Sequence, residues 1–477
     1  MKKACEWLDI KSIWKTIFMI FFICVPLFLL PEGLFVAFVA FALVLFFVNK
    51  VNIKRFSLFI FILALALRVC VVFAVPTPPA SDFQVHFEAS QQMVAGDNNY
   101  LEMSYFKTWA YQIGIVFFQS LFLRIWNNVI ILKLVNCIIS AATCVLVYKI
   151  ANEFTENKPS QGAALIYCFL PFTVFYPTIL SNQYPSSFLI YLGIYIVISK
   201  KLKLNSYVRY SLFGGLLALA DVFRPESIIP LFATVLFLLI TINKENIKQN
   251  FINIGLLLIA YFGVFNIINS LFIVTQIAPL GLSNNDPLWK FVSGFNHSTK
   301  GQWSLDDTFL VQTVPEIDII KSRVFVPIHQ LIELFVSKIK IFWCGTGVEW
   351  AFSSFYESGI TVFGKYLSVG KFVNFANATS MWMMVLSYLL VIWGVAKGLK
   401  KKTDNPHILL LVNQIFVTFG VYLIIEVQPR YIYHIQISVL IVVALGISAI
   451  YDAVKKWRRN HSCVIKDKAD AKELEDL

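Results

Sequence analysis

The chain is poor in charge. Lys, Arg, Asp and Glu make up 14% of its 477 residues, whereas hydrophobic residues make up 58%, and the mean hydropathy is +0.70. A water-soluble globular protein needs a larger polar surface, so this composition excludes one. Apolar runs of about 17 residues or more have the length of membrane-spanning helices. We therefore predict an all-α, polytopic membrane protein.

The sequence also lacks the usual cysteine patterns. Its eight cysteines form no Cys-x-x-Cys pair and have no metal-ligand spacing with histidine. Most of them, such as Cys137 and Cys144, lie inside apolar runs, and we interpret them as packing residues. No small-residue cleavage site follows the first apolar run, 13–30, which is also too long for a signal-peptide core. We expect that run to remain as a membrane anchor.

The apolar runs predict about twelve spans, separated by two long loops and followed by a charged tail. Two spans lie within residues 1–55, a membrane core occupies 56–273, a long loop occupies 274–372, and further spans lie within 373–454. The charged tail 455–477 is expected to be cytoplasmic and partly unstructured. The predicted spans are 13–30, 33–49, 56–75, 129–149, 161–180, 184–199, 208–223, 226–242, 251–273, 373–396, 407–425 and 431–451.

The distribution of positive charge predicts the topology. If the apolar but polar-interrupted stretch 109–126 is not a span, Lys and Arg concentrate in one set of short loops, such as 200–209, while the short loops on the other side hold only Arg224 and Arg430. By the positive-inside rule both termini are then cytoplasmic, and 76–128 and 274–372 face outward. We place 109–126 as a helix along the outer surface. The formal net charge of +12 follows this loop pattern, so no nucleic-acid partner is predicted.

The first outer loop carries the strongest candidate for chemistry, Asp82. Three prolines within 76–79 end the run 56–75. Ser81 and Gln84 have the spacing of a capping box, which predicts a helix with Asp82 in its first turn.

The dipole of that helix would favour the ionised carboxylate of Asp82, as a general base or a metal ligand requires. His86 shares the helix face with Asp82 at the i,i+4 spacing, and Glu88 is a nearby acid, but the sequence assigns neither a role. The alternative is a solvated loop acid that only caps a short helix.

Further charges lie at the outer ends of later spans. Arg224 is part of the sequence ADVFRPES, and Glu426, Arg430 and Tyr431 belong to EVQPRY. We expect the arginines to bind an anion, and Glu426 to orient Arg430 from one helical turn away. Such residues also serve as snorkelling anchors or as a simple ion pair, and these alternatives stay open.

The loop 274–372 is too long for a connection and is rich in tryptophan, so we expect it to be ordered and functional. Within it, 328–342 predicts an amphipathic interfacial helix with no required role beyond anchoring. The stretch 294–307 contains Asn296 and Trp303, residue types that hydrogen-bond to sugars and stack on them, although they are also ordinary loop residues.

Taken together, these motifs resemble a known class of enzymes. A proline-rich exit with Asp82 and the stretch from Ala89 to Gly96, Arg224 before a proline, and Glu426-x-x-x-Arg430-Tyr431 before the last span are similar to lipid-phosphosugar-dependent glycosyltransferases of the GT-C class. The bacterial branch related to protein O-mannosyltransferases and the lipid A aminoarabinose transferase is the most similar, over about 56–451.

This resemblance implies a GT-C-like fold with Asp82 as the catalytic acid of the first outer loop. It also implies that Arg224 and Arg430 hold the phosphate of a polyprenyl-phosphate-sugar donor. Many relatives have two adjacent acids in this loop, whereas Asp82 is followed by Phe83. No cofactor is therefore assigned, and a divalent metal is left open.

The expected function is glycosyl transfer to a glycan, lipid or protein acceptor on the outer face of a cell membrane, by an inverting hexosyl- or pentosyltransferase. The reaction needs a base for the acceptor hydroxyl and positive charge for the leaving phosphate. The short cytoplasmic loops contain no Gly-rich phosphate loop, which argues against a nucleotide-sugar donor. The alternatives are a transporter or flippase of lipid-linked sugars, for which internal repeats and midplane charges are typical, and a scaffold without chemistry.

The topology can be tested by labelling single cysteines with a membrane-impermeant reagent in a background without native cysteines. We expect Trp303→Cys to react from outside the cell and Asn205→Cys to react only after the membrane is opened. Labelling of Asn205→Cys in intact cells would contradict the assigned orientation.

Overall fold

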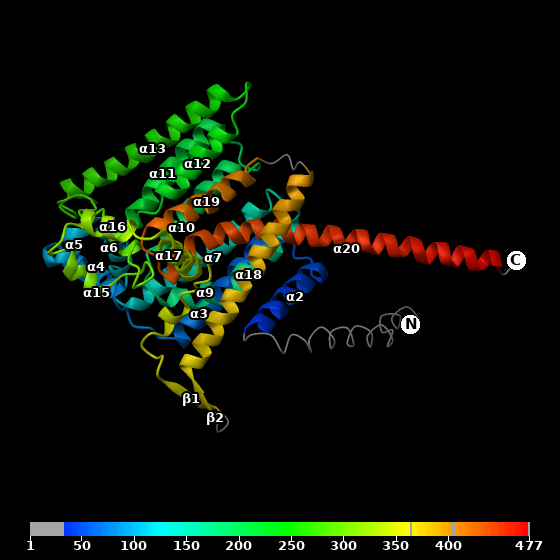
Figure 1. Ribbon diagram of the computed structural model, residues 1–477, viewed down its shortest axis with the longest axis horizontal. Helices are drawn as coiled ribbons and strands as arrows, with labels where there is room; N and C mark the ends of the chain where they lie inside the picture. The colour runs from blue at the N-terminus through cyan, green and yellow to red at the C-terminus, as the bar shows by residue number, and fades with distance from the viewer. Residues whose placement is uncertain (1–32, 363–364, 402–405, 476–477) are drawn as a thin grey trace.

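The computed structural model describes residues 33–362, 365–401 and 406–475 (Figure 1). These residues form an all-α protein with one small addition, an antiparallel hairpin of β1 (Gly359–Val362) and β2 (Lys365–Ser368). The predicted fold class is confirmed. The predicted span 13–30 lies outside the described residues.

The other predicted spans each correspond to helical segments of the bundle. The run 161–180 differs from the prediction, because its helix ends at Phe169, Leu170 before Pro171 is extended, and a short helix follows. The segments are α2 (Leu34–Lys50), α3 (Phe56–Ala74), α7 (Val129–Ala151), α8 (Asn157–Phe169), α9 (Pro171–Phe175) with η3 (Tyr176–Thr178), α10 (Gln183–Ile198), α11 (Ser206–Phe223), α12 (Ile228–Ile240), α13 (Ile247–Val274), α18 (Val369–Lys401), α19 (Ile408–Ile424) and α20 (Tyr433–Glu475).

Within the described residues, five helices are long and apolar enough to cross a membrane by themselves: α3, α7, α13, most of α18, and the stretch Pro429–Lys456 that includes the first part of α20. Shorter apolar helices such as α2 and α19 accompany them. The chain is thus a multi-pass membrane protein, and the count of twelve spans is not confirmed.

The core of the bundle is built around α20. Every side chain from Tyr433 to Ala444 is buried, and α20 packs against α18, α8, α19 and α7. A second group forms where α11 packs between α10 and α13. The tail, expected to be partly unstructured, continues α20 as a helix through Glu475 and projects from the bundle in Figure 1. Its Lys, Ala, Glu and Leu residues are strong helix formers.

The first long loop, 76–128, folds into short helices at one end of the bundle. They are α4 (Asp82–Ala95), η1 (Asn99–Glu102), α5 (Ser104–Thr108), η2 (Ala110–Gln112) and α6 (Ile113–Leu123). The predicted surface helix over 109–126 is therefore divided, and its longer part, α6, packs against α4, α7 and α11. With 11 residues, α6 is shorter than the roughly 20 residues that a span needs.

The described part of the second long loop also contains helices. It contains α14 (Trp289–Gly294), α15 (Leu305–Leu310), α16 (Glu316–Val324), α17 (Ile328–Trp343) and η4 (Val348–Phe352). The amphipathic helix predicted over 328–342 is α17, with His329 and Glu333 exposed and Leu334 and Phe342 buried.

Lys338 of α17 is buried as well, which the sequence did not indicate. Its ammonium donates to the carbonyl oxygens of Gly294, Leu423 and Ile425 at 2.8, 2.7 and 2.8 Å. Carbonyls at helix ends lack intrahelical donors. Lys338 therefore ties the long loop to the ends of α14 and α19.

A second buried lysine fixes the exit from α3. Lys133 of α7 is 1% exposed and donates to the carbonyl of Thr77 at 2.5 Å, and the Thr77 hydroxyl donates to the carbonyl of Ala351 at 2.5 Å. This chain of contacts joins the proline-rich exit to η4, so the two long loops are held together.

The close approach of α6 to α11 gives a stability prediction. A Cβ at Gly114 would lie 1.8 Å from the carbonyl oxygen of Val222, whereas a Cβ at Gly255 on α13 would meet nothing within 4 Å. We expect Gly114→Ala to destabilise the protein by about 1–3 kcal/mol through overpacking. Thermal unfolding in detergent measures the effect, and Gly255→Ala is the matched control. Equal unfolding temperatures for Gly114→Ala and the wild type would contradict the described packing.

Candidate functional site

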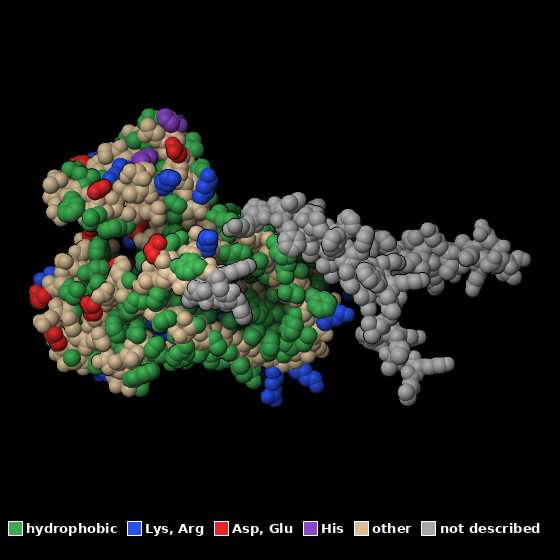
Figure 2. Space-filling model, turned by 90° about the horizontal axis from the view of Figure 1, so that it is seen from below, with side chains coloured by type: hydrophobic (Ala, Val, Ile, Leu, Met, Phe, Trp, Pro, Cys, Tyr) green, Lys and Arg blue, Asp and Glu red, His purple; other side chains and the backbone are tan. Residues whose placement is uncertain are grey.

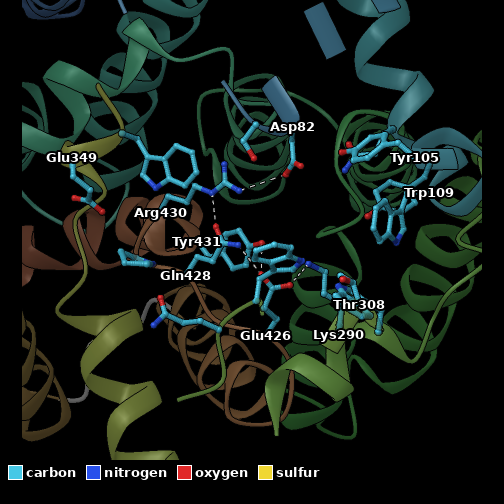
Figure 3. A pocket seen from close by; sticks show the side chains of 18 residues that line it. Asp82, Tyr105, Trp109, Lys290, Thr308, Glu349, Glu426, Gln428, Arg430 and Tyr431 are labelled. Atoms are coloured by element: carbon cyan, nitrogen blue, oxygen red, sulfur yellow. Dashed lines mark hydrogen bonds and ion pairs between the residues drawn. The ribbon is translucent and has the colours of Figure 1, made fainter. Parts of the chain in front are cut away.

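The two long loops and residues 426–431 enclose a cavity of about 680 Å³ (Figure 3). Figure 2 shows the molecular surface hollowed between two lobes, with acidic and basic side chains along the hollow. Aromatic and polar side chains dominate the cavity wall. It is lined by Ser81, Asp82, Tyr105, Trp109, Tyr111, Gln112, Trp289, Lys290, Gln302, Trp303, Thr308, Glu349, Trp350, Glu426, Gln428, Pro429, Arg430 and Tyr431.

Asp82 reaches this cavity from the first turn of α4. The helix begins where the sequence predicted, but the capping box is absent: the Ser81 side chain makes no cap hydrogen bond, and Gln84 donates to Glu88 at 2.7 Å instead. Ser81 has a φ of 53°, a left-handed conformation that is uncommon for residues other than glycine. The sharp entry leaves the Asp82 side chain 45% exposed on the wall.

Arg430 faces Asp82 across the cavity from η5 (Pro429–Ile432). Its Nη2 lies 3.7 Å from Oδ2 of Asp82. The guanidinium packs against the rings of Trp350 and Phe83, at 4.4 and 4.8 Å from their centroids, and its Nε donates to Oε1 of Gln428 at 2.8 Å. Cation–π contacts and a directed hydrogen bond thus fix its orientation.

Glu426 lies buried at the bottom of the same wall. It is 2% exposed and its Oε2 lies 2.6 Å from the ammonium of Lys290. Its Oε1 accepts from Nε2 of Gln428 at 2.7 Å and from the Tyr431 hydroxyl at 3.2 Å. Burial alone would raise the pKa of Glu426, but Lys290 and these donors lower it below its ordinary value.

The expected direct orientation of Arg430 by Glu426 needs correction. Residues 426–428 are not helical, so the two side chains are not one helical turn apart. The Gln428 amide stands between them and contacts both.

Arg224 lies behind this wall rather than on it. Its Nε is 2.5 Å from Oε1 of Glu226, and its Nη1 donates to Oδ1 of Asn182 at 3.0 Å. The guanidinium lies 5.0 Å from the ring centroid of Tyr431. The structure therefore places Arg224 against the back of a cavity residue and pairs its charge.

His86 and Glu88 on α4 also lie outside the cavity lining. His86 is buried, and its Nε2 is 3.1 Å from the hydroxyl of Tyr105, which does line the cavity. Burial lowers the pKa of His86 to about 4, with Asp82 opposing the shift and Arg430 adding to it, so the ring is neutral at pH 7. Glu88 is exposed.

Of the two candidate residues in the second loop, Trp303 lines the cavity and Asn296 does not. Trp303 is 49% exposed and lines the cavity. Asn296 is buried, and its amide donates to the carboxylate of Asp307 at 3.0 and 3.1 Å while its oxygen accepts from Ser298. Asn296 thus holds the turn that carries Trp303.

Several wall residues were not predicted, notably Lys290, Gln428, Glu349 and Tyr105. Gln428 lies inside the EVQPRY motif and could have been noted there, whereas Lys290 reaches the site only through the fold of α14. The described part of the chain brings no three His, Cys, Asp or Glu side chains together as a metal site.

Comparison with known proteins gives one family. Residues 113–268 match the family model of dolichyl-phosphate-mannose-protein mannosyltransferases. No curated protein sequence matches the chain.

Two solved structures from Archaeoglobus fulgidus are similar. The archaeal oligosaccharyltransferase AglB in complex with an inhibitory peptide and a dolichol-phosphate is 12% identical, with a TM-score of 0.48 over 86% of this chain and 52% of that one. The apo form of an oligosaccharyltransferase from that organism is 13% identical, with a TM-score of 0.47 over 86% and 52%. The chain spans about half the length of these structures.

The ion pair between partly exposed Lys290 and buried Glu426 gives a prediction about stability. Lys290→Met leaves the Glu426 carboxylate without its cation, and we expect a loss of about 1–3 kcal/mol in unfolding free energy. Adding Glu426→Gln should recover much of this loss, because the amide carries no charge.

The stabilisation from the Glu426–Lys290 pair should decrease at low pH. Because the pKa of Glu426 is lowered in the folded state, its stabilisation is present above the ordinary carboxyl pKa of about 4.3 and decreases as pH falls through the lowered value. Thermal unfolding of the wild type, Lys290→Met and the double variant at several pH values checks both expectations. Equal stability of the wild type and Lys290→Met at pH 7 would contradict them.

Proposed function

We propose that the protein is a membrane glycosyltransferase. The premise is the resemblance of residues 113–268 to the dolichyl-phosphate-mannose-protein mannosyltransferases. It takes a sugar from a polyprenyl-phosphate-linked donor and transfers it to a glycan, lipid or protein acceptor. The observation that carries the proposal is the pair of Asp82 and Arg430, which face each other at 3.7 Å in the cavity between the two long loops.

The pair supplies the two functions that the reaction needs. The Asp82 carboxylate accepts the proton of the acceptor hydroxyl as that oxygen bonds to the anomeric carbon. The bond between this carbon and the donor phosphate breaks, and the phosphate leaves with the electron pair, stabilised by the Arg430 guanidinium. A single displacement of this kind inverts the anomeric configuration.

Other wall residues support the same reaction. Tyr431 and Glu426 hold the floor of the cavity, and the Lys290 ammonium, paired with Glu426, lies 5.6 Å from the centroid of the Tyr431 ring. Arg224 packs behind that ring, with its charge paired to Glu226. Trp303 offers an exposed aromatic face on which a sugar can stack, with Asn296 fixing its turn.

The proposed orientation follows from charge and from the donor. By the positive-inside rule the basic short loops support a cytoplasmic position for both termini, and the cavity would then lie at the outer face of the membrane. A donor whose lipid tail lies in the bilayer would then present its phosphate at the level of the cavity.

One experiment separates transfer from transport. Purified protein is incubated with a labelled polyprenyl-phosphate sugar and candidate acceptors in liposomes. A glycosyltransferase yields a labelled acceptor or free lipid phosphate, whereas a transporter or flippase moves the donor between leaflets unchanged. Movement without chemical conversion, or conversion of a nucleotide sugar with no lipid donor, would overturn the proposal.

Asp82→Asn should abolish transfer without unfolding the protein. The two side chains are nearly isosteric, while the base is lost, so turnover should fall by about two to four orders of magnitude. Glu88→Gln is the matched control, because Glu88 lies on the same helix and is exposed outside the cavity lining. Turnover by Asp82→Asn close to that of Glu88→Gln would show that Asp82 is not the base.

A further inference from the structure

The amide of Gln428 connects an ion pair to an arginine. Its Nε2 donates to Oε1 of Glu426 at 2.7 Å, and its Oε1 accepts from Nε of Arg430 at 2.8 Å. The other oxygen of Glu426 lies 2.6 Å from Lys290. The order of contacts is therefore Lys290, Glu426, Gln428 and Arg430, and all four side chains line the cavity (Figure 3).

These contacts leave one edge of Arg430 for a ligand. Nε is occupied by Gln428, and the rings of Trp350 and Phe83 pack against the guanidinium. Nη2 forms an ion pair with Asp82 at 3.7 Å, which is longer than a hydrogen bond, and within the described residues Nη1 has no hydrogen bond. A guanidinium held in this way presents its two Nη groups together, which is the geometry that binds two oxygens of a phosphate.

The neutrality of Gln428 matters as much as its geometry. A carboxylate bonded directly to Arg430 would orient it equally well, but it would also cancel the positive charge that attracts an anion. Glu426 instead pairs closely with Lys290. The Gln428 amide, held by Glu426, orients the Arg430 guanidinium but carries no charge. By contrast, Arg224 is paired directly with Glu226 at 2.5 Å.

We infer that Gln428 is a positioning residue that aims Arg430 at the donor phosphate without placing a further negative charge beside it. The inference rests on the proposed function, because it takes the anion to be the phosphate of a polyprenyl lipid. It assigns a role in binding to a residue that the sequence analysis did not single out.

The experiment measures binding of undecaprenyl phosphate to the purified full-length protein in detergent, followed by tryptophan fluorescence. Gln428→Met keeps the length of the side chain but removes both hydrogen bonds. We expect the Kd of this variant to rise about tenfold to a hundredfold, the effect of losing the hydrogen bond to the charged guanidinium of Arg430. Gln428→Glu should weaken binding at least as much, because its carboxylate neutralises Arg430.

Gln84→Met is the matched control. Gln84 also donates to a glutamate, Glu88, at 2.7 Å, but it lies outside the cavity lining, so its Kd should stay within about twofold of the wild type. A double-mutant cycle distinguishes positioning from general structural support. In an Arg430→Met background, Gln428→Met should cause no further loss of phosphate binding, although Glu426 loses a hydrogen-bond donor in both backgrounds.

The possible failures are distinct. Unchanged binding by Gln428→Met or Gln428→Glu, or the same loss with and without Arg430, would overturn the positioning role while leaving the proposed function intact. A wild-type protein that does not bind undecaprenyl phosphate would overturn the proposed function itself.

Discussion

The ion pair of Glu426 and Lys290 is the interaction on which the cavity depends. A carboxylate that is 2% exposed needs a cation and hydrogen-bond donors, and Glu426 receives them from three different places: Lys290 on α14, Gln428 before η5, and Tyr431 within η5. The cation and hydrogen-bond donors that pair with the buried Glu426 carboxylate therefore hold the second long loop against the start of the last helix. The cavity wall that carries Arg430 is a consequence of that requirement.

Two buried lysines extend the same principle to the ends of the bundle. Lys338 collects carbonyls from the ends of α14 and α19, and Lys133 holds the carbonyl of Thr77 at the exit from α3. Each places a cation where backbone oxygens would otherwise lack donors. The loops that carry Asp82 and Trp303 are thus fixed by specific polar contacts, which gives Asp82 and Arg430 a defined separation before any substrate binds. Such preorganisation is what electrostatic stabilisation of a leaving group requires.

The sequence predicted the helical membrane class, the helix that starts at Asp82 and the amphipathic helix in the second loop, because hydrophobic runs, prolines and helical periodicity act locally. It could not predict which charges meet. Arg224 and Arg430 looked alike as outer arginines, yet Arg224 is paired with Glu226 behind the wall and Arg430 faces the cavity. Lys290 and Glu426 are far apart in the chain, so only the tertiary fold reveals their pairing. Asn296 and Trp303 were both candidates for contact with a sugar, but one short turn buries Asn296 and leaves Trp303 exposed.

The central claim is that Arg430 binds the donor phosphate in the cavity that Asp82 faces as the base. An experimental structure of the protein bound to a polyprenyl-phosphate lipid tests it most directly. The account predicts the phosphate within hydrogen-bond distance of the Nη atoms of Arg430, with the Asp82 carboxylate facing the same cavity and the lipid tail leading into the bilayer. A phosphate bound elsewhere, with Arg430 still directed only at Asp82, would contradict the account.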